Sequence, residues 1–172
     1  AYVLMDEQPA IRDRSGAEPL RVAAGRVDFE RVSFAYGAGV PALDDVSFSL
    51  PPGRMTALVG ASGAGKTTVS NLVPRFYEVT EGAVRIDGQD VRDVTLASLR
   101  EQIGLVSQEI VLFDDTVRAN IAFGKADASD DEIAEAVRAA ALDDVIAALP
   151  EGLDTPLGPD GARLSGGQRQ RV

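Results

Sequence analysis

Cysteine, histidine and tryptophan are all missing from this sequence of 172 residues. Without cysteine the chain can form no disulfide and no thiolate metal site, and without histidine it holds no imidazole base. Lysine is scarce as well, because Lys66 and Lys125 are the only lysines among 17 basic residues. These absences exclude several common kinds of catalytic and metal centre, and they draw attention to Lys66, which lies in a glycine-rich run.

Long hydrophobic runs are also missing. The longest apolar runs, such as residues 55–59, are far too short to cross a bilayer, and the first ten residues carry acid where a secretory signal carries base. Acidic residues number 27, and the net charge of −10 argues against nucleic acid as the main partner. The first residue is not methionine, so we expect a piece of a longer protein, large enough for one domain with a real core.

Patterns of apolar residues predict several strands. Apolar residues alternate through residues 27–34 but change phase near Glu30-Arg31, which predicts a strand with a bulge or bend. Residues 46–50 predict a second alternating strand. Residues 55–59 and 103–106 are nearly all apolar, which is typical of strands that are covered on both faces.

Turn and cap residues place a hairpin and the helices. Asp87-Gly88 lies between two short apolar stretches and predicts a hairpin turn. Ser129 and Glu132 have the S-x-x-E spacing of a capping box, so a helix is expected to begin there, with one apolar stripe. Further helices are predicted from about residue 65 to 72, from Thr95 to about residue 102, and in a stretch that ends at Pro150; residues 152–163 are expected to form a loop.

The run Gly60-Ala61-Ser62-Gly63-Ala64-Gly65-Lys66-Thr67 fits the phosphate-binding pattern G-x-x-x-x-G-K-[ST]. A predicted strand precedes this run and a predicted helix follows it, which is the context that the motif requires. Glycine lets the backbone approach a phosphate closely, and the helix start adds partial positive charge. Lys66 is expected to reach the β- and γ-phosphates, and the Thr67 hydroxyl is expected to ligate Mg²⁺. The expected backbone N–H donors are Gly63, Ala64, Gly65, Lys66, Thr67 and Thr68.

A second and rarer run, Leu164-Ser165-Gly166-Gly167-Gln168, follows further along the chain. In this order the two motifs resemble the ATP-binding-cassette (ABC) family, whose signature is LSGGQ. From about residue 25 to residue 172 the chain is similar to the nucleotide-binding domain of exporters of the bacterial lipid-flippase and multidrug types. The resemblance implies an α/β fold: a P-loop ATPase core with a parallel sheet, an antiparallel β subdomain and an α-helical signature subdomain, with the C-terminal part missing.

The resemblance also implies roles for individual residues. Tyr36 is expected to stack on adenine, and Gln108 to ligate Mg²⁺ and sense the γ-phosphate. The signature residues Ser165, Gly166, Gly167 and Gln168 are expected to contact ATP held by a second nucleotide-binding domain. Residues 110–120 are expected to lie near the membrane domain, where Val111, Leu112 and Phe113 fit a docking surface or a local core equally well. One departure stands out: Pro159 replaces a glutamate that the family usually has, and the neighbouring Asp160 is a candidate substitute.

At the level of the whole protein, the resemblance implies ATP binding, and in the complete parent protein ATP hydrolysis that powers export or flipping across a membrane. Residues 1–24 are expected to be a linker from an absent membrane domain, and residues 25–172 an incomplete nucleotide-binding domain at the cytoplasmic face of the plasma (inner) membrane. The expected partners are a second nucleotide-binding domain, identical or not, and the membrane domain of the same transporter. The family's Walker B Asp, its adjacent Glu and its switch His are not among these residues, so we expect the chain alone to be inactive and residues 55–59 to lack a neighbouring strand.

Two alternatives compete with an exporter. A soluble ABC ATPase that works on DNA or ribosomes would carry basic patches or a long coiled-coil insertion between Lys66 and Ser165. The net charge and the short spacing both argue against it. A degenerate half of a heterodimer, which binds nucleotide without hydrolysing it, stays open because the residues that would decide are not in this sequence.

Overall fold

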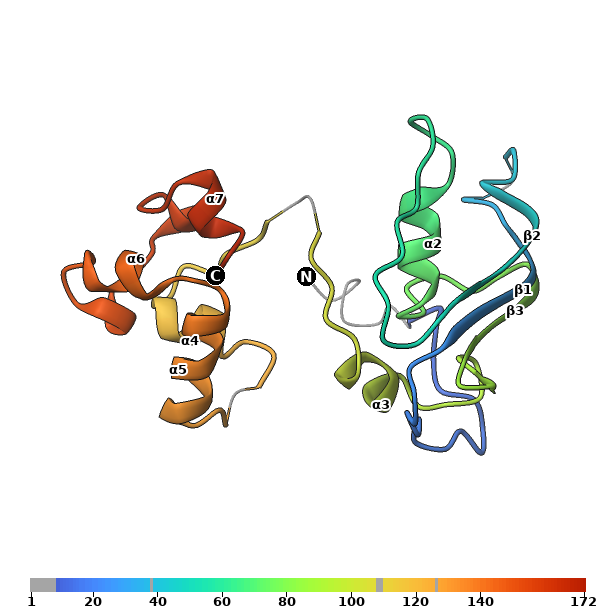
Figure 1. Ribbon diagram of the computed structural model, residues 1–172, viewed down its shortest axis with the longest axis horizontal. Helices are drawn as coiled ribbons and strands as arrows, with labels where there is room; N and C mark the ends of the chain where they lie inside the picture. The colour runs from blue at the N-terminus through green and yellow to red at the C-terminus, as the bar shows by residue number, and fades with distance from the viewer. Residues whose placement is uncertain (1–8, 38, 108–109, 126) are drawn as a thin grey trace, which may run out of the picture. The chain divides into compact units, whose positions relative to one another are not determined.

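Figure 1 shows the computed structural model, which describes residues 9–37, 39–107, 110–125 and 127–172. The chain divides into two compact units, residues 1–104 and residues 105–172. Among the described residues, no helix has the length and apolar character that crossing a bilayer requires.

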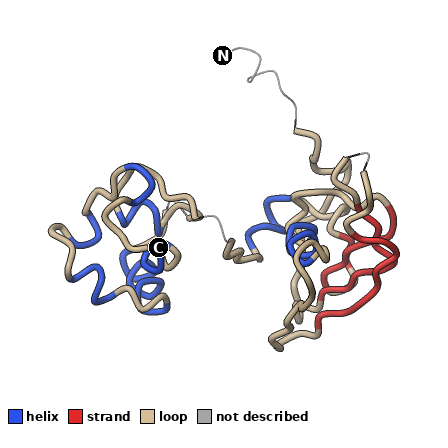
Figure 2. The backbone as a smooth tube through the Cα atoms, turned by 90° about the horizontal axis from the view of Figure 1, so that it is seen from above, coloured by secondary structure: helices blue, strands red, loops and turns tan. Residues whose placement is uncertain are grey.

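The first unit is built on an antiparallel sheet of four strands in the order β2-β1-β3-β4. Figures 1 and 2 show these strands side by side, with the helix α2 (Lys66–Leu72) next to the sheet. The sheet confirms the two predicted alternating strands and the hairpin at Asp87-Gly88, both of whose residues have a positive φ, as a tight hairpin turn requires. The strands are β1 (Val27–Phe34), β2 (Leu43–Leu50), β3 (Glu81–Ile86) and β4 (Gln89–Asp90).

The predicted bulge in β1 is confirmed. The register of β1 against β2 shifts between Phe29 and Val32, and Arg31 adopts a φ of 47°. Gly82 of β3 lies against this bulge with a φ of 78°, and a Cβ there would come within 2.2 Å of the Arg31 carbonyl oxygen. Only glycine fits this position, because both the backbone conformation and the close approach exclude a side chain.

Helices cover one face of the sheet, and the core lies between these helices and the sheet. The helix α2 (Lys66–Leu72) confirms the helix that was predicted after the phosphate-binding run, and α3 (Leu96–Glu101) confirms the helix predicted after Thr95. Phe29 and Phe48 stack across the sheet with ring centroids 4.6 Å apart. The buried core of this unit is apolar and consists of Leu20, Phe29, Val32, Phe34, Leu43, Val69, Leu72, Val84, Ile86, Val91, Val94 and Leu99.

The described part of the N-terminal segment packs on this unit. Leu20 belongs to the buried core, and Glu18 forms a parallel bridge with Val94. The Gln89 side chain donates to the Arg21 carbonyl at 2.7 Å and accepts the Arg21 N–H at 3.1 Å. The role of residues 1–24 as a linker to another domain stays a prediction, but residues 18–21 are held in place.

Two predicted strands are not formed by the described residues. Residues 55–59 and 103–106 have no strand structure, and Met55, Val59 and Val106 are almost fully exposed. A strand exists only where its backbone N–H and C=O groups pair with a neighbour, and no other strand pairs with these segments in the described part of the chain. The predicted parallel sheet is therefore not formed by the described residues, whose sheet is antiparallel.

The second unit is helical in its described residues. Ser129 and Glu132 form the predicted capping box at the start of α5, in which each accepts the other's backbone N–H. Ile133 and Val137 of the predicted stripe are buried, whereas Ala141 lies beyond the helix with a φ of 52°. The helices are α4 (Val117–Ile121), α5 (Asp130–Ala139), α6 (Asp143–Ala147) and α7 (Gly166–Arg169).

The region predicted as a loop, residues 152–163, contains two short 3₁₀ turns, at Gly152–Asp154 and Pro159–Gly161. Between them Thr155 and Leu157 are completely buried. The Thr155 carbonyl accepts the N–H of Val117 at 3.1 Å, which fixes this loop against the start of α4. Buried Leu112, Val117, Leu157 and Leu164 form the core beneath the signature motif.

Candidate functional site

The phosphate loop folds around its own lysine. The Lys66 ammonium donates to the carbonyl oxygens of Gly60 at 2.9 Å and Ala61 at 2.7 Å, which are the first two residues of the motif. The Ala64 N–H donates to the Ala61 carbonyl at 3.2 Å and closes the turn. The only charged side chain of the motif is therefore held over the loop before any anion arrives.

Gly65 joins the loop to α2 and cannot be replaced without strain. It is the N-cap of the helix with a φ of 82°, and a Cβ there would lie 2.7 Å from the Ala42 carbonyl oxygen and 2.8 Å from Leu43 Cδ2. Its carbonyl accepts the N–H of Val69 at 3.0 Å, so α2 starts directly from it. No acidic residue occurs in the first turn of α2, which leaves the partial positive charge of that end uncompensated.

A pocket of about 500 Å³ lies at this loop and is lined by Tyr36, Ala42, Ser62, Gly63, Gly65, Lys66, Thr67 and Thr68. We call it the phosphate-loop pocket. Six of its lining residues come from the loop and from α2, and all six were expected to bind nucleotide. The pocket also includes Tyr36, which is 30 positions away from Lys66 in sequence. Gly60 and Ala64 do not line it, and Gly60 instead accepts the Lys66 ammonium.

Tyr36 stands just beyond the end of β1 and is half exposed. Its hydroxyl donates to Thr68 Oγ1 at 3.2 Å, and its ring meets the rings of Phe34 and Tyr77 nearly at right angles. Sequence reasoning selected Tyr36 but missed Tyr77 and the bond to Thr68. Nothing in the local pattern around residue 77 pointed to the pocket.

The two expected Mg²⁺ ligands differ in how they are placed. Thr67 is exposed in the wall of the phosphate-loop pocket beside Lys66, where its hydroxyl fits a ligand to a phosphate-bound cation. Gln108 lies outside the described residues. Elsewhere in the described part of the chain, no group of three or more His, Cys, Asp or Glu side chains could hold a metal ion.

The signature motif lies in the second unit and starts a short helix, as predicted. Ser165 is the N-cap of α7: its Oγ accepts the N–H of Gln168 at 3.3 Å, and Gln168 Oε1 accepts the N–H of Ser165 at 2.7 Å. Gly166 and Gly167 are exposed in the first turn, and nothing lies within 4 Å of where a Cβ would stand on either. Leu164 is buried and anchors the motif to the core.

The loop before the signature contains Pro159, the residue that departs from the family pattern. Pro159 starts the 3₁₀ turn Pro159–Gly161. Its ring cannot supply the charge of the glutamate that the family usually has there. The side chain of Asp160 lies outside what the structure describes, so its role as a substitute stays a prediction.

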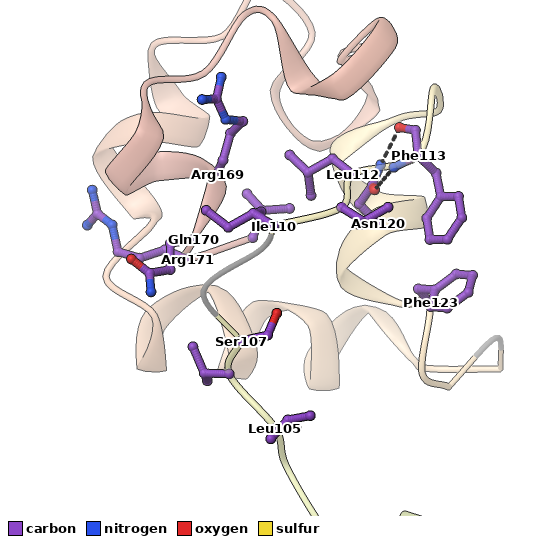
Figure 3. Close-up of a pocket in the computed structure, with 13 residues that line it drawn as sticks. Leu105, Ser107, Ile110, Leu112, Phe113, Asn120, Phe123, Arg169, Gln170 and Arg171 are labelled. Atoms are coloured by element: carbon purple, nitrogen blue, oxygen red, sulfur yellow. Dashed lines mark hydrogen bonds between the residues drawn. The ribbon is translucent and has the colours of Figure 1, made fainter. Parts of the chain in front are cut away.

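A second pocket, of about 390 Å³, lies in the second unit between residues 105–107 and 110–113 on one side and the end of α7 on the other (Figure 3). We call it the Phe113 pocket. The rings of Phe113 and Phe123 stack with centroids 4.3 Å apart, and both are exposed. Asn120 is buried beside them: its Oδ1 accepts the Phe113 N–H at 2.8 Å, and its Nδ2 donates to the Phe113 carbonyl at 3.1 Å.

This geometry divides the apolar run that the sequence left open between docking surface and local core. Leu112 is 8 % exposed and belongs to the core, whereas Val111 is 72 % exposed and Phe113 is 45 % exposed. Asn120 was missed by sequence reasoning, although it holds the backbone of Phe113. An asparagine in a short helix gives no signal of this kind before the fold brings it to its partner.

Comparisons with known proteins agree with these motifs. A family model described as "ABC transporter" matches residues 43–172. The human protein "ATP-binding cassette sub-family B member 6" is 50 % identical over 171 residues, which are 99 % of this chain and 20 % of the human protein. A putative multidrug export ATP-binding/permease protein of Staphylococcus aureus is 46 % identical over 172 residues, 99 % of this chain and 30 % of its own length.

Among solved structures, a bacterial Atm1-family ABC exporter with ATP bound superposes with a TM-score of 0.92 at 44 % identity. The match covers 99 % of this chain and 30 % of the exporter chain. The chain therefore spans only about a fifth to three tenths of the length of these relatives. The family model, the relatives and the folded motifs lead to one conclusion: this chain belongs to the ABC transporter family.

Proposed function

We propose that this chain binds ATP with Mg²⁺ in the phosphate-loop pocket, and that in the complete protein it hydrolyses ATP to power export across a membrane. The observation that carries the proposal is that Tyr36 and Lys66 line one pocket. The loop there is already folded, because the Lys66 ammonium donates to two of its carbonyl oxygens. A base at Tyr36 and phosphates at Lys66 would therefore be held in the same pocket.

Each group in the pocket then has a task. The backbone N–H groups of residues 63–68 would donate to phosphate oxygens, and Lys66 would turn its ammonium from the loop carbonyls toward the β- and γ-phosphates. Thr67 and Gln108 would ligate Mg²⁺, which neutralises charge on the phosphates when bound. Tyr36 would stack on adenine, a contact that contributes about 1–3 kcal/mol per base in other proteins.

The signature would complete the site of a second copy or of a related domain. In our proposal Ser165, Gly166, Gly167 and Gln168 face the γ-phosphate held by the partner's phosphate loop, so ATP joins the two domains. The exposed first turn of α7 supports this role, because Gly166 and Gly167 there carry no side chain that would keep an incoming anion from the backbone. Closure on ATP and opening after hydrolysis would drive the membrane domain.

The membrane domain of the same transporter would contact the Phe113 pocket, at the cytoplasmic face of the membrane. Exposed Val111, Phe113 and Phe123 support an apolar contact there. We also propose that residues 55–59 and 103–106 join a parallel sheet when the strands that carry the family's Walker B residues are present. For the same reason the 172 residues alone would not hydrolyse ATP.

A complementation assay in the full-length protein tests the composite site. Lys66→Ala removes one half of every site and Ser165→Ala the other, so each variant alone should show almost no ATP-dependent phosphate release. A mixed dimer of the two variants contains one site with both halves intact and should recover measurable hydrolysis. If mixing restores nothing although dimers form, each site is made by a single chain and the proposal is wrong. ATP-driven export by vesicles that contain the protein then separates an exporter from a soluble ATPase or a non-hydrolysing half.

A further inference from the structure

The aromatic wall of the phosphate-loop pocket is held by the segment that also carries the loop. The Tyr36 hydroxyl donates to Thr68 Oγ1 at 3.2 Å. Thr68 lies in α2, two residues after Lys66, and is only 4 % exposed. Because the Thr68 hydroxyl that accepts this bond is buried, the bond holds the Tyr36 hydroxyl in one orientation. The bond therefore connects the side chain at the end of β1 to the helix that starts from the phosphate loop.

Ring contacts restrict Tyr36 from another direction. The centroids of Tyr36 and Tyr77 lie 5.0 Å apart with the planes at 87°, and those of Tyr36 and Phe34 lie 4.8 Å apart at 86°. Phe34 and Tyr77 also meet, at 5.5 Å. Phe34 is 5 % exposed and fixed in the core, so the three rings form one packed group that leaves half of Tyr36 open.

We propose that Thr68 and Tyr77 are positioning residues that hold the Tyr36 ring ready for the base of the nucleotide. The inference rests on the proposed function, in which Tyr36 stacks on adenine. Thr68 lies within α2 and Tyr77 follows its C-terminal end, so both residues belong to the segment that begins at the phosphate loop. A side chain that is already ordered loses less conformational entropy when the base arrives, and the nucleotide binds more tightly for that reason.

The alternative for Thr68 is a direct bond from its hydroxyl to a phosphate. The two roles differ in which part of the nucleotide they affect. A positioning role acts only through the base, so it disappears when the ligand has no base. A direct role acts on the phosphates, so it persists. Inorganic tripolyphosphate keeps the phosphates of ATP and lacks the base, and it therefore separates the two roles.

The experiment is isothermal titration of the full chain with MgATP and, separately, with magnesium tripolyphosphate. Thr68→Val keeps the shape of the side chain and removes its hydroxyl, and Tyr77→Ala removes the ring. Each should weaken ATP binding roughly two- to tenfold, the range of one lost neutral hydrogen bond or one aromatic contact, and leave tripolyphosphate binding unchanged. Thr68→Ser keeps the hydroxyl and Tyr77→Phe keeps the ring, so each should recover the ATP affinity that Thr68→Val or Tyr77→Ala loses.

A double-mutant cycle adds a second readout. Tyr36→Phe removes the same hydrogen bond from its other end, so the double variant Tyr36→Phe/Thr68→Val should bind ATP no more weakly than the weaker single variant. Tyr36→Phe also leaves buried Thr68 unchanged, and it keeps the test valid if Thr68→Val does not fold. Ser70→Ala, on an exposed position of the same helix, controls for general effects on α2.

The outcomes separate the inference from the proposed function. ATP affinity unchanged in Thr68→Val, additive effects in the cycle, or equal weakening of tripolyphosphate would each overturn the positioning role. Tripolyphosphate binding without any preference for ATP in the unaltered chain would overturn base stacking at Tyr36. If the unaltered, folded chain bound neither ligand, the phosphate-loop assignment itself would be wrong.

Discussion

Asp87 Oδ2 accepts the backbone N–H of Gly25 at 2.9 Å, although the two residues are 62 positions apart. The same oxygen accepts the N–H groups of Ala23 and Ala24, and Oδ1 accepts that of Arg26. These bonds, of which the one from Gly25 contributes most, hold the pKa of the Asp87 carboxyl far below its usual range. One carboxylate in the β3–β4 turn thus fixes the chain where it enters β1.

The bonds to the Asp87 carboxylate should make the stability of the first unit sensitive to acid. A carboxyl whose pKa is lowered in the fold stabilises it above the unfolded value near 4, and this contribution is lost as pH falls through that value toward the folded one. Asp87→Asn should therefore unfold more easily than the unaltered chain at pH 7, and the difference should shrink below pH 4. Urea unfolding at both pH values measures it.

The control for Asp87 is Asp93→Asn, which breaks an exposed ion pair with Arg14. Exposed pairs contribute little, so this variant should stay close to the unaltered chain. Amide exchange at residues 23–26 should rise in Asp87→Asn alone. Equal protection in both variants would mean that the four N–H groups do not depend on the charge of Asp87.

Lys66→Ala should weaken ATP binding roughly tenfold or more, because the phosphates would lose the only side-chain cation of the loop and charge-assisted hydrogen bonds contribute about 1.5–3 kcal/mol each. Lys125→Ala is the matched control, because Lys125 pairs with Glu132 in the second unit. Titration with a fluorescent ATP analogue measures both. Similar affinity in the two variants would contradict the assignment of the loop.

Gly65→Ala should disrupt the phosphate loop more than Gly63→Ala does. Both residues have a φ near 80°, where a side chain costs about 1–2 kcal/mol, but only at Gly65 would the new Cβ collide with the Ala42 backbone. Thermal melts should show a small loss for Gly63→Ala and a larger one for Gly65→Ala, together with weaker binding of tripolyphosphate. Equal losses would show that the backbone at Ala42, just before β2, moves aside easily.

Ser165→Ala and Ser129→Ala remove the same kind of cap from two helices of the second unit. Each should cost about 1 kcal/mol of stability, measured by urea unfolding. Only Ser165→Ala should also abolish ATP turnover in the full-length protein, while ATP binding to a single domain stays near normal. Loss of turnover in Ser129→Ala as well would assign the defect to helix stability instead of the signature.

Features that are made within a few residues could be predicted from the sequence. The bulge at Arg31 follows from a change of phase, the turn at Asp87-Gly88 from two residues that tolerate positive φ, and the capping box at Ser129 from its spacing to Glu132. The phosphate loop is of the same kind, because Lys66 bonds to residues five and six positions before it. In each case both partners lie in the same short stretch, so their spacing alone is sufficient.

Features whose partners are distant in sequence depend on how the chain folds, so local patterns could not specify them. Residues 55–59 are apolar enough for a buried strand, yet a strand needs a neighbouring backbone, and in the described part of the chain none pairs with them. Tyr36 meets Thr68 and Tyr77, and Asp87 meets Gly25, only because β1 folds back beside α2 and β3. Composition and periodicity record how apolar a segment is, but the identity of its partner is fixed only when the chain closes on itself.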